Sequence, residues 1–310
     1  MIRRGLRGGF FSRLWGHDLA WSFRSSPVTV AAALLAAACI GGALAAPWLA
    51  PQNPFDLAAL DLNEAFKPPA WIEGGVARYP FGTDNQGRDV LSTILYGTRL
   101  SLAVGFASVL LAMVLGVALG LAAGYFGGRL DAAIMRVADV QLSFPAILIA
   151  LLIDGVARVA IAQELHDALA VYVLVLSIGL SKWVDFARTV RGSTLVERNK
   201  EYVQAARIIG RGPLGILGSH VLPNVIGPVL VIATLNIGIA IITEATLSFL
   251  GVGVPPTSPS LGTLIQIGGN YLFSGEWWIT VFPALMLILI VLSVNLLGDW
   301  LRDALNPRLR

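Results

Sequence analysis

The side chains that could carry out chemistry are few in this sequence and stand far apart. The three histidines, His17, His166 and His220, form no His-Glu-x-x-His pattern, and Cys39 is the single cysteine. No Gly-Lys dipeptide is present, so the chain has no phosphate-binding loop for ATP. A Gly-x-Ser-x-Gly nucleophile elbow is also missing. The sequence therefore predicts a chain that is not an enzyme by itself and that holds no cofactor or metal of its own.

A polar, cationic segment at residues 201–224 separates two long apolar stretches. Ala205-Ala206 and the residues around them favour a short helix, and Gly210 can end that helix in a left-handed turn. Arg211-Gly212-Pro213 is typical of a corner, and its proline suits the first turn of a second helix. We expect the second helix to end before Leu222-Pro223. The pattern predicts helix, tight turn and helix; a basic loop that only sets the orientation of the chain is the alternative.

Composition indicates the environment of this segment. The chain has 310 residues, of which 56% are hydrophobic and only 13% are charged, and its mean hydropathy is +0.74. Soluble domains carry about 25% charged residues. The chain is therefore expected to lie in a lipid bilayer. Nucleic acid is an unsuitable partner, because the basic residues flank apolar runs and do not alternate with stacking aromatics.

The apolar runs predict an all-α membrane protein with six transmembrane helices. The expected spans are 28–50, 100–125, 131–156, 168–182, 225–250 and 278–297. A break is possible in the third span at Ser143-Phe144-Pro145. Gly116, Gly120 and Gly124 lie four residues apart in the second span, so they share one helix face and allow a neighbouring helix to approach closely.

The distribution of basic residues predicts the orientation. Most of the 22 lysines and arginines fall outside the spans on the side that holds both termini and the 201–224 segment, which is therefore expected to be cytoplasmic. The predicted divisions are an N-terminal segment (1–27), a first span (28–50), an external loop (51–99), a five-helix core (100–301) that contains a polar loop at 188–224, and a C-terminal tail (302–310).

Two carboxylates, Asp139 and Glu244, are candidates for a pathway or a gate. Glu244 is the one acid well inside an apolar run, and an acid in the membrane is a functional candidate by default. Its position near the outer end of the fifth span also suits a hydrogen-bonded structural role. Asp139 follows Arg136 by three residues, and the two side chains can satisfy each other on one helix face.

The external loop ends in a motif whose residues favour a turn. The side chain of Thr83 or Asp84 can accept a hydrogen bond from a backbone amide within a turn, and Gly87 can adopt the backbone conformation that such a turn needs. Arg88 can pair with a nearby acid, and Asp89 can cap the helix that follows. The motif predicts a turn that leads into the next span; direct contact with a substrate is the alternative.

The 201–224 segment resembles the EAA loop of ABC-importer permeases. The resemblance rests on Ala205-Ala206, on Gly210 after three intervening residues, and on His220-Val221-Leu222-Pro223 after a further gap. Gln204 stands where that motif has Glu, and His220 stands where it has an apolar residue. Tyr202-Val203-Gln204 with His220 to Asn224 is similar to the branch of peptide and nickel permeases.

Three further stretches resemble the same branch in the same order. They are Phe81 to Asp89, Leu247 to Gly253 followed by two prolines, and Leu297 to Pro307, in which Asn306 replaces a more usual Asp. The chain is therefore identified by resemblance with the DppC/OppC-type permease subunits of bacterial ABC peptide importers, which have the type I ABC-importer permease fold and lie in the inner membrane.

This resemblance implies partners and a mechanism. It implies a second, homologous permease subunit, two ATP-binding subunits that hold ATP and Mg, and a periplasmic solute-binding protein. It further implies import of di- or oligopeptides by alternating access, with ATPase coupling through the 201–224 segment. The implied coupling residues are Glu201, Tyr202, Gln204, Ala205, Ala206, Gly210, Pro213, His220, Leu222 and Pro223. Nickel chelates, glutathione or another peptide-like solute are alternative cargoes, and a secondary transporter or channel is the alternative of a different class.

Overall fold

The computed structural model describes residues 17–56, 60–255 and 257–305, and within them the chain is helical, with one isolated bridge between Thr83 and Asp89. The elements are α2 (His17–Ser25), α3 (Pro27–Leu44), α4 (Ala46–Leu49), η2 (Leu62–Glu64), α5 (Val90–Phe126), α6 (Gly128–Leu142), α7 (Ala146–Ala160), α8 (Gln163–Glu197), α9 (Glu201–Ile208), α10 (Pro213–Ile216), η3 (Leu217–Val221), α11 (Leu222–Phe249), α12 (Leu261–Gly269), η4 (Leu272–Ser274) and α13 (Trp278–Leu305). The expected all-α class is confirmed. The N-terminal segment up to residue 16 and the tail from residue 306 lie outside the described residues.

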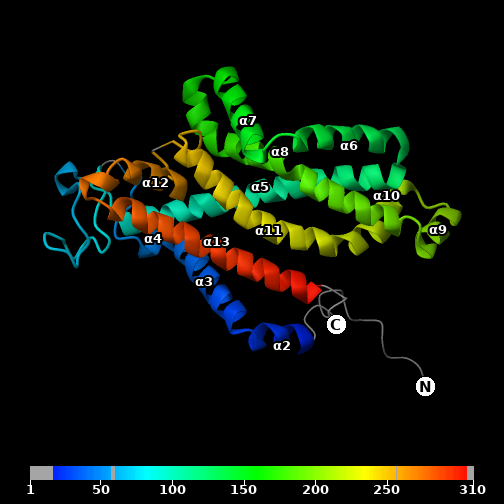
Figure 1. Cartoon of the computed structure of the whole chain (residues 1–310), viewed down its shortest axis with the longest axis horizontal. Coiled ribbons are helices and arrows are strands. Elements are labelled where there is room, and N and C mark those ends of the chain that lie inside the picture. Colours follow the sequence, from blue (N-terminus) through cyan, green and yellow to red (C-terminus); the bar gives the residue numbers. More distant parts are fainter. Residues whose placement is uncertain (1–16, 57–59, 256, 306–310) are drawn as a thin grey trace.

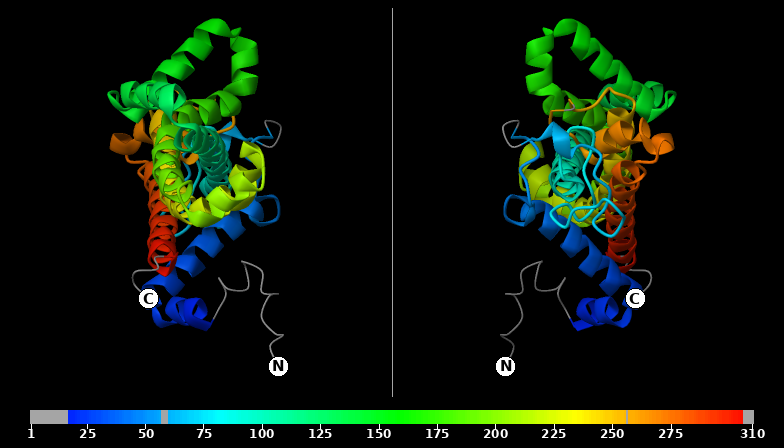
Figure 2. Two further views of the ribbon diagram at one scale, coloured as in Figure 1. Left: turned by 90° about the vertical axis from the view of Figure 1, so that its right-hand side faces the viewer. Right: turned by 90° about the vertical axis from the view of Figure 1, so that its left-hand side faces the viewer.

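The long helices form an elongated bundle with α9 at one end and α12 at the other (Figure 1). These two ends are called the α9 end and the α12 end below. Five helices are long and apolar enough to cross a membrane, and α6 with α7 makes a sixth if that bent pair is one span. The pair bends by 95° at the expected break before Pro145. Proline ends the helix there because it lacks a backbone donor and restricts the preceding residue. Figure 2 shows that α7 projects from the side of the bundle away from α2 and α3.

Several helices extend beyond the apolar runs that predicted them. α5 begins at Val90, directly after its expected cap Asp89 and ten residues before the expected span, and α8 continues to Glu197. Residues 188–197 therefore belong to a helix, although they were expected in a polar loop. α13 likewise continues into the expected tail. The differences have one physical cause: hydropathy drops at the edge of a membrane, whereas backbone hydrogen bonding continues wherever polar side chains are solvated or paired.

The glycine stripe of α5 packs against α8, as its spacing predicts. A β-carbon on Gly116 would lie 2.4 Å from Cβ of Phe186, and one on Gly124 would lie 2.6 Å from Cβ of Thr194. Phe186 is among the largest fully buried side chains of the described chain. The absence of side chains at these glycines is therefore what lets the two backbones approach.

Polar side chains tie α6 to α8. Arg191 Nη2 donates to Asp131 Oδ2 at 2.7 Å, and Arg188 forms an ion pair with Asp139. The expected pairing of Asp139 with Arg136 is therefore wrong, because α6 turns this acid toward α8. Farther along, Trp183 Nε1 donates to Gln141 Oε1 at 2.8 Å.

The turn before α5 has the predicted local structure. Asp84 accepts from the Gln86 amide at 2.8 Å and pairs with Arg88 Nε at 2.6 Å, and Gly87 has a φ of +73°. Asp89 caps α5 by accepting from the Ser92 amide at 2.7 Å. Trp278 Nε1 donates to Thr83 O at 3.1 Å and so attaches the turn to the start of α13. These bonds support the structural role of the motif at the α12 end.

Candidate functional site

The 201–224 segment forms a helix, a tight turn and a second helix at the α9 end (Figure 1). α9 ends in Gly210, whose φ is +84°. The Arg211 amide donates to Ala206 O at 3.1 Å and the Gly210 amide donates to Arg207 O at 2.9 Å, which is the Schellman pattern. No atom lies within 4 Å of a β-carbon built on Gly210, so backbone conformation alone demands glycine here. Pro213 then opens α10 in its first turn.

The second helix was expected to end before Leu222-Pro223, and this expectation is wrong. α10 continues through a five-residue π-helix, Leu217–Val221, into α11, and Pro223 lies in the first turn of α11. A π-helical turn shifts the hydrogen-bond pattern from i→i+4 to i→i+5. This shift relieves both the missing donor and the ring clash of a proline inside a helix. The 201–224 segment is thus joined rigidly to a long helix of the bundle.

α9 buries one face and exposes another. Val203 and Ala206 are buried in the main apolar core together with Ile216 of α10. On the outside, Ile208 is 87% exposed and Ile209 is 84% exposed, and Leu214 beyond the turn is 81% exposed. Three large aliphatic side chains in solvent at one end of a molecule are typical of a surface that a partner covers.

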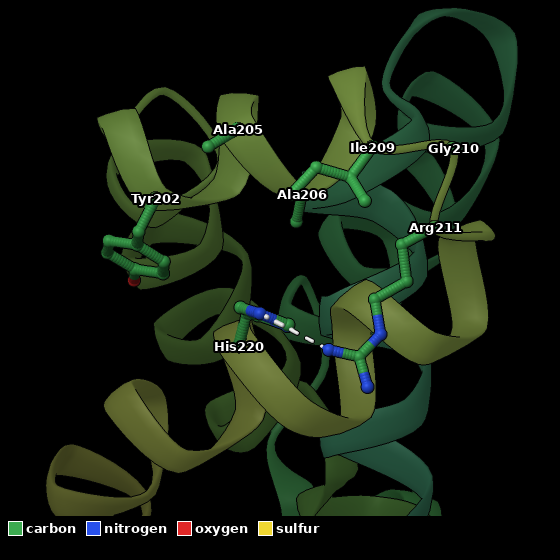
Figure 3. A pocket seen from close by; sticks show the side chains of 7 residues that line it. All are labelled: Tyr202, Ala205, Ala206, Ile209, Gly210, Arg211 and His220. Carbon is green, nitrogen blue, oxygen red and sulfur yellow. Dashed lines mark hydrogen bonds between the residues drawn. The ribbon is translucent and has the colours of Figure 1, made fainter.

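Between α9 and the π-helix lies a cavity of about 520 Å³ (Figure 3). Its lining residues are Tyr202, Ala205, Ala206, Ile209, Gly210, Arg211 and His220. The rings of Tyr202 and His220 stack with centroids 6.4 Å apart, and Arg211 Nη1 lies 3.5 Å from His220 Nε2. Figure 3 shows the Arg211 and His220 side chains pointing toward each other below Ala206.

A hydrogen-bond network holds the Tyr202 side of the cavity. The Tyr202 hydroxyl donates to Glu197 and accepts from Asn224 Nδ2 at 3.2 Å, and Asn224 also donates to His220 O at 2.6 Å. Burial raises the pKa of Tyr202 to about 12, and the neighbouring carboxylate of Glu197 adds to the rise. The phenol therefore stays protonated and remains a donor at physiological pH.

Two arginines connect the segment to the end of α5. Arg198 Nη1 donates to Gly124 O at 2.8 Å and so caps carbonyl groups at the C-terminus of α5. The guanidinium of Arg207 in α9 lies 4.9 Å from the centroid of the Tyr125 ring. The sequence carries no signal for these contacts, because the partners are more than 70 residues apart along the chain.

The structure brings together half of the predicted coupling residues. Tyr202, Ala205, Ala206, Gly210 and His220 line the cavity. Arg211 and Ile209 line it as well and were not predicted. The other predicted residues lie around it: Glu201 in the first turn of α9, Gln204 with its amide on Asn199 O at 3.1 Å, Pro213 in α10, and Leu222 and Pro223 in α11.

The two candidate gate acids lie apart from the cavity. Glu244 is fully buried in α11, where it accepts from Ser101 Oγ at 2.7 Å and from Ser248 Oγ at 2.8 Å. Ser101 Oγ in turn accepts from the Leu261 amide at 3.2 Å, so this network joins α5, α11 and α12. Asp139 is engaged by Arg188 on the outside of α8. Within the described residues, no group of three His, Cys, Asp or Glu side chains could hold a metal ion.

Comparisons with known proteins show which family this chain resembles. Residues 116–310 match the family model described as binding-protein-dependent transport system inner membrane component. A di/tripeptide transport system permease protein of Pseudomonas aeruginosa is 38% identical over 273 residues, with 86% of this chain and 84% of the relative covered. A dipeptide transport system permease protein of Haemophilus influenzae is 37% identical over 265 residues, with coverage of 86% and 85%.

A further relative and a solved structure also match this chain. A glutathione transport system permease protein of Pectobacterium atrosepticum is 38% identical over 291 residues, with 93% of this chain and 89% of the relative covered. Among solved structures, a chain of the inward-facing MetNI methionine ABC transporter matches with a TM-score of 0.53 and 18% identity, covering 69% of this chain and 96% of that one. At this identity the likeness concerns the fold.

Proposed function

Since the chain belongs to the family of binding-protein-dependent transport system inner membrane components, we propose that it is the transmembrane subunit of an ATP-driven importer for di- or oligopeptides. It is a multi-pass protein of the inner membrane and a transport permease, not a catalytic subunit. Membership in this family argues against a secondary transporter or a channel. The peptide substrate is supported by the names of relatives that are 38% and 37% identical to this chain over the aligned residues.

The observation that carries the coupling role is the structure of the α9 end. A short helix with exposed aliphatic side chains projects beyond the bundle, and its base is joined to α5 and α11 by packing, a capping arginine and a continuous helix. Such an element can transmit a displacement to the spans because it is not a free loop. Tyr202, Ala205, Ala206 and Gly210 would shape the docked surface.

Other subunits would complete the transporter. Two ATP-binding subunits would hold ATP and Mg and hydrolyse the nucleotide, a second permease subunit would complete the pathway, and a periplasmic solute-binding protein would deliver the cargo. The free energy of docking must differ between the inward and outward states, since a ligand shifts an equilibrium only by its differential affinity for the two states. In this arrangement the α9 end and both termini face the cytoplasm. The contact of Phe23 in α2 with Trp300 in α13, at 5.2 Å between ring centroids, supports a common side for the two termini.

Glutathione is the second candidate substrate. The glutathione permease of Pectobacterium atrosepticum is as similar to this chain as the di/tripeptide permease of Pseudomonas aeruginosa, at 38% identity for each. Glutathione is itself a tripeptide, so both assignments describe one class of cargo. Uptake assays with labelled dipeptide, tripeptide and glutathione would separate them.

Substitution of Ala206 tests the coupling role. The residue packs in the apolar core, is only 6% exposed and also lines the cavity, so the long charged side chain of Ala206→Arg can reach solvent only through the cavity, where a partner would dock. We expect the variant to insert normally, to lose uptake, and to lose the ATP-binding subunits when the complex is purified in mild detergent. Ala70→Arg adds the same side chain at an exposed position of the α12 end and is the matched control.

A second variant separates docking from folding of α9. Ile208 is 87% exposed, so Ile208→Asn removes an apolar contact for a partner without disturbing the core. We expect a smaller but clear loss of the ATP-binding subunits. Normal uptake and normal co-purification in both variants would contradict the proposed coupling role.

A further inference from the structure

The cavity at the α9 end contains a positive charge that forms no ion pair within the described residues. Arg211 is exposed, and its guanidinium points into the cavity toward His220 (Figure 3). None of the ion pairs found within residues 17–56, 60–255 and 257–305 includes Arg211. A guanidinium is protonated at any physiological pH. The charge is therefore available to a group that enters from outside.

His220 adds a second group that can bind an anion. Its Nε2 atom lies 3.5 Å from Arg211 Nη1, and in the tautomer protonated at Nε2 this nitrogen is a donor beside the guanidinium. An imidazole N–H and a guanidinium N–H can both donate to one carboxylate, and charge-assisted hydrogen bonds of this kind are among the strongest in proteins. Among the described residues, no acid lines the cavity, since Glu201 lies outside it and Gln204 is neutral and bonded to Asn199.

The rim of the cavity indicates a protein as the source of the anion. Ile209 lines the cavity and is exposed, and the exposed side chains of Ile208 and Leu214 stand on the same two short helices, α9 and α10. A free inorganic anion would leave these aliphatic groups in water, whereas a docked protein surface would cover them. A charged contact enclosed by apolar contacts is also the arrangement in which a buried pair is shielded from solvent.

We infer that this cavity receives an acidic side chain, Asp or Glu, from the ATP-binding subunit, and that Arg211 and His220 bind its carboxylate. The inference rests on the proposed function, because it names the chemistry by which that partner docks. Ala206 forms the wall above the two basic groups (Figure 3), so a longer side chain there would occupy the space that the carboxylate needs. Tyr202, held by Glu197 and Asn224, forms the wall beside His220.

Cross-linking in the complete transporter tests the inference. A carbodiimide joins a lysine amine to a carboxylate that it touches, so the Arg211→Lys variant should give a covalent adduct to an Asp or Glu of the ATP-binding subunit. Arg129→Lys, at an exposed position of α6 at the same end, is the matched control. Mass spectrometry must map the adduct to position 211, because the natural Lys200 lies immediately before α9.

Neutral variants provide the second measurement. Arg211→Gln, and His220→Leu separately, should weaken retention of the ATP-binding subunit by roughly tenfold each, which is the usual effect of losing one hydrogen bond to a charged group. Arg129→Gln should leave retention unchanged. Both cavity residues are outside the apolar core, so the permease should keep its thermal stability.

The outcomes separate the inference from the proposed function. An adduct at position 211 together with weakened retention supports the inference. Full retention of the ATP-binding subunit by Arg211→Gln, without an adduct in Arg211→Lys, overturns the inference and leaves the proposed function intact. Bound anionic phospholipid that Arg211→Gln removes, with retention unaffected, would assign the cavity to lipid and also overturns it. Absence of any ATP-binding subunit from the natural complex would contradict both the inference and the proposed function.

Discussion

Glu244 is satisfied by hydroxyl groups and not by a basic residue. It accepts hydrogen bonds from Ser101 of α5 and Ser248 of α11, and Ser101 also accepts from the backbone of α12. Every member of this network is buried. A buried polar network is stable when all its groups are paired and costly when one partner is removed. This geometry favours a structural junction at the α12 end over a gate.

Two substitutions at Glu244 distinguish a junction from a gate. Glu244→Gln keeps the shape and the acceptor oxygen, so we expect near-normal stability and uptake. Glu244→Ala removes the acceptor for both serines and leaves a cavity, so we expect a loss of about 1–3 kcal/mol and a lower melting temperature in detergent. Thermal unfolding of the purified protein and peptide uptake are the two measurements.

The gate hypothesis makes the opposite forecast for the same pair. If the carboxylate itself moved protons or contacted cargo, Glu244→Gln would abolish uptake while the melting temperature stayed unchanged. That result would contradict the structural role.

At the scale of elements, the contact of α5 with α8 depends on the absence of side chains. A β-carbon on Gly120 would lie 2.6 Å from Ala187 O and 2.8 Å from Cβ of Val190. Real β-carbons do not approach other atoms so closely, and the obstacle is partly backbone, which cannot rotate away. The stripe of Gly116, Gly120 and Gly124 therefore sets the distance between two long helices, and α8 in turn carries the 201–224 segment at its end.

Gly120→Val tests this packing. The variant forces α5 and α8 apart, and we expect a loss of about 1–3 kcal/mol or a failure to assemble. Gly192→Val is the matched control, because no atom lies within 4 Å of a β-carbon at Gly192 of α8. Melting temperature and yield in detergent are the readouts. Equal behaviour of the two variants would show that close approach of these helices is not needed.

The connection of α9 to the bundle is also a property of elements. Arg198 binds the last turn of α5, Arg207 lies over Tyr125 in that turn, and the π-helix joins α10 to α11 without a break. A displacement of α9 must therefore act on α5 and α11 together. This arrangement gives the proposed docking event two direct routes into the spans.

At the scale of the whole molecule, the proposed orientation places the α9 end in the cytoplasm and the α12 end in the periplasm. The α9 end holds the basic side chains of Arg198, Lys200, Arg207 and Arg211, and such side chains are retained on the cytoplasmic side during insertion. The α12 end instead holds the 51–89 loop, whose aromatic residues pack on the start of α13. The two ends thus differ in charge and in the partners that they could meet.

Cysteine labelling checks this orientation. Cys39 is the single cysteine and is buried, so Cys39→Ser provides a background without thiols. We expect a membrane-impermeant maleimide to label Phe273→Cys, at a 98% exposed position of the α12 end, from the periplasmic side. Ile208→Cys at the α9 end should be labelled only after the cells are opened. The reverse pattern would invert the topology and remove the α9 end from the reach of cytoplasmic subunits.

The sequence by itself determined the features that depend on near neighbours. The apolar runs predicted six spans, of which the structure contains five, with α6 and α7 as a bent sixth. Asp89 predicted a helix cap and Gly210 predicted a left-handed helix end, and the structure contains both. These features follow from hydropathy and from backbone conformation over a few residues, so local sequence is sufficient for them. The first helix and the tight turn of the 201–224 segment belong to the same group, whereas the coupling role of its residues stays a prediction.

Only the tertiary structure decided the contacts between distant segments. Asp139 pairs with Arg188 instead of Arg136, α8 continues to Glu197, and the helix passes through Leu222-Pro223 by way of a π turn. Arg211 lies beside His220 in a cavity that the sequence around either residue does not predict. The physical reason is the same in each case: a polar or aromatic side chain binds whichever partner the packing of helices brings within a few ångströms, and sequence spacing contains no information about that packing.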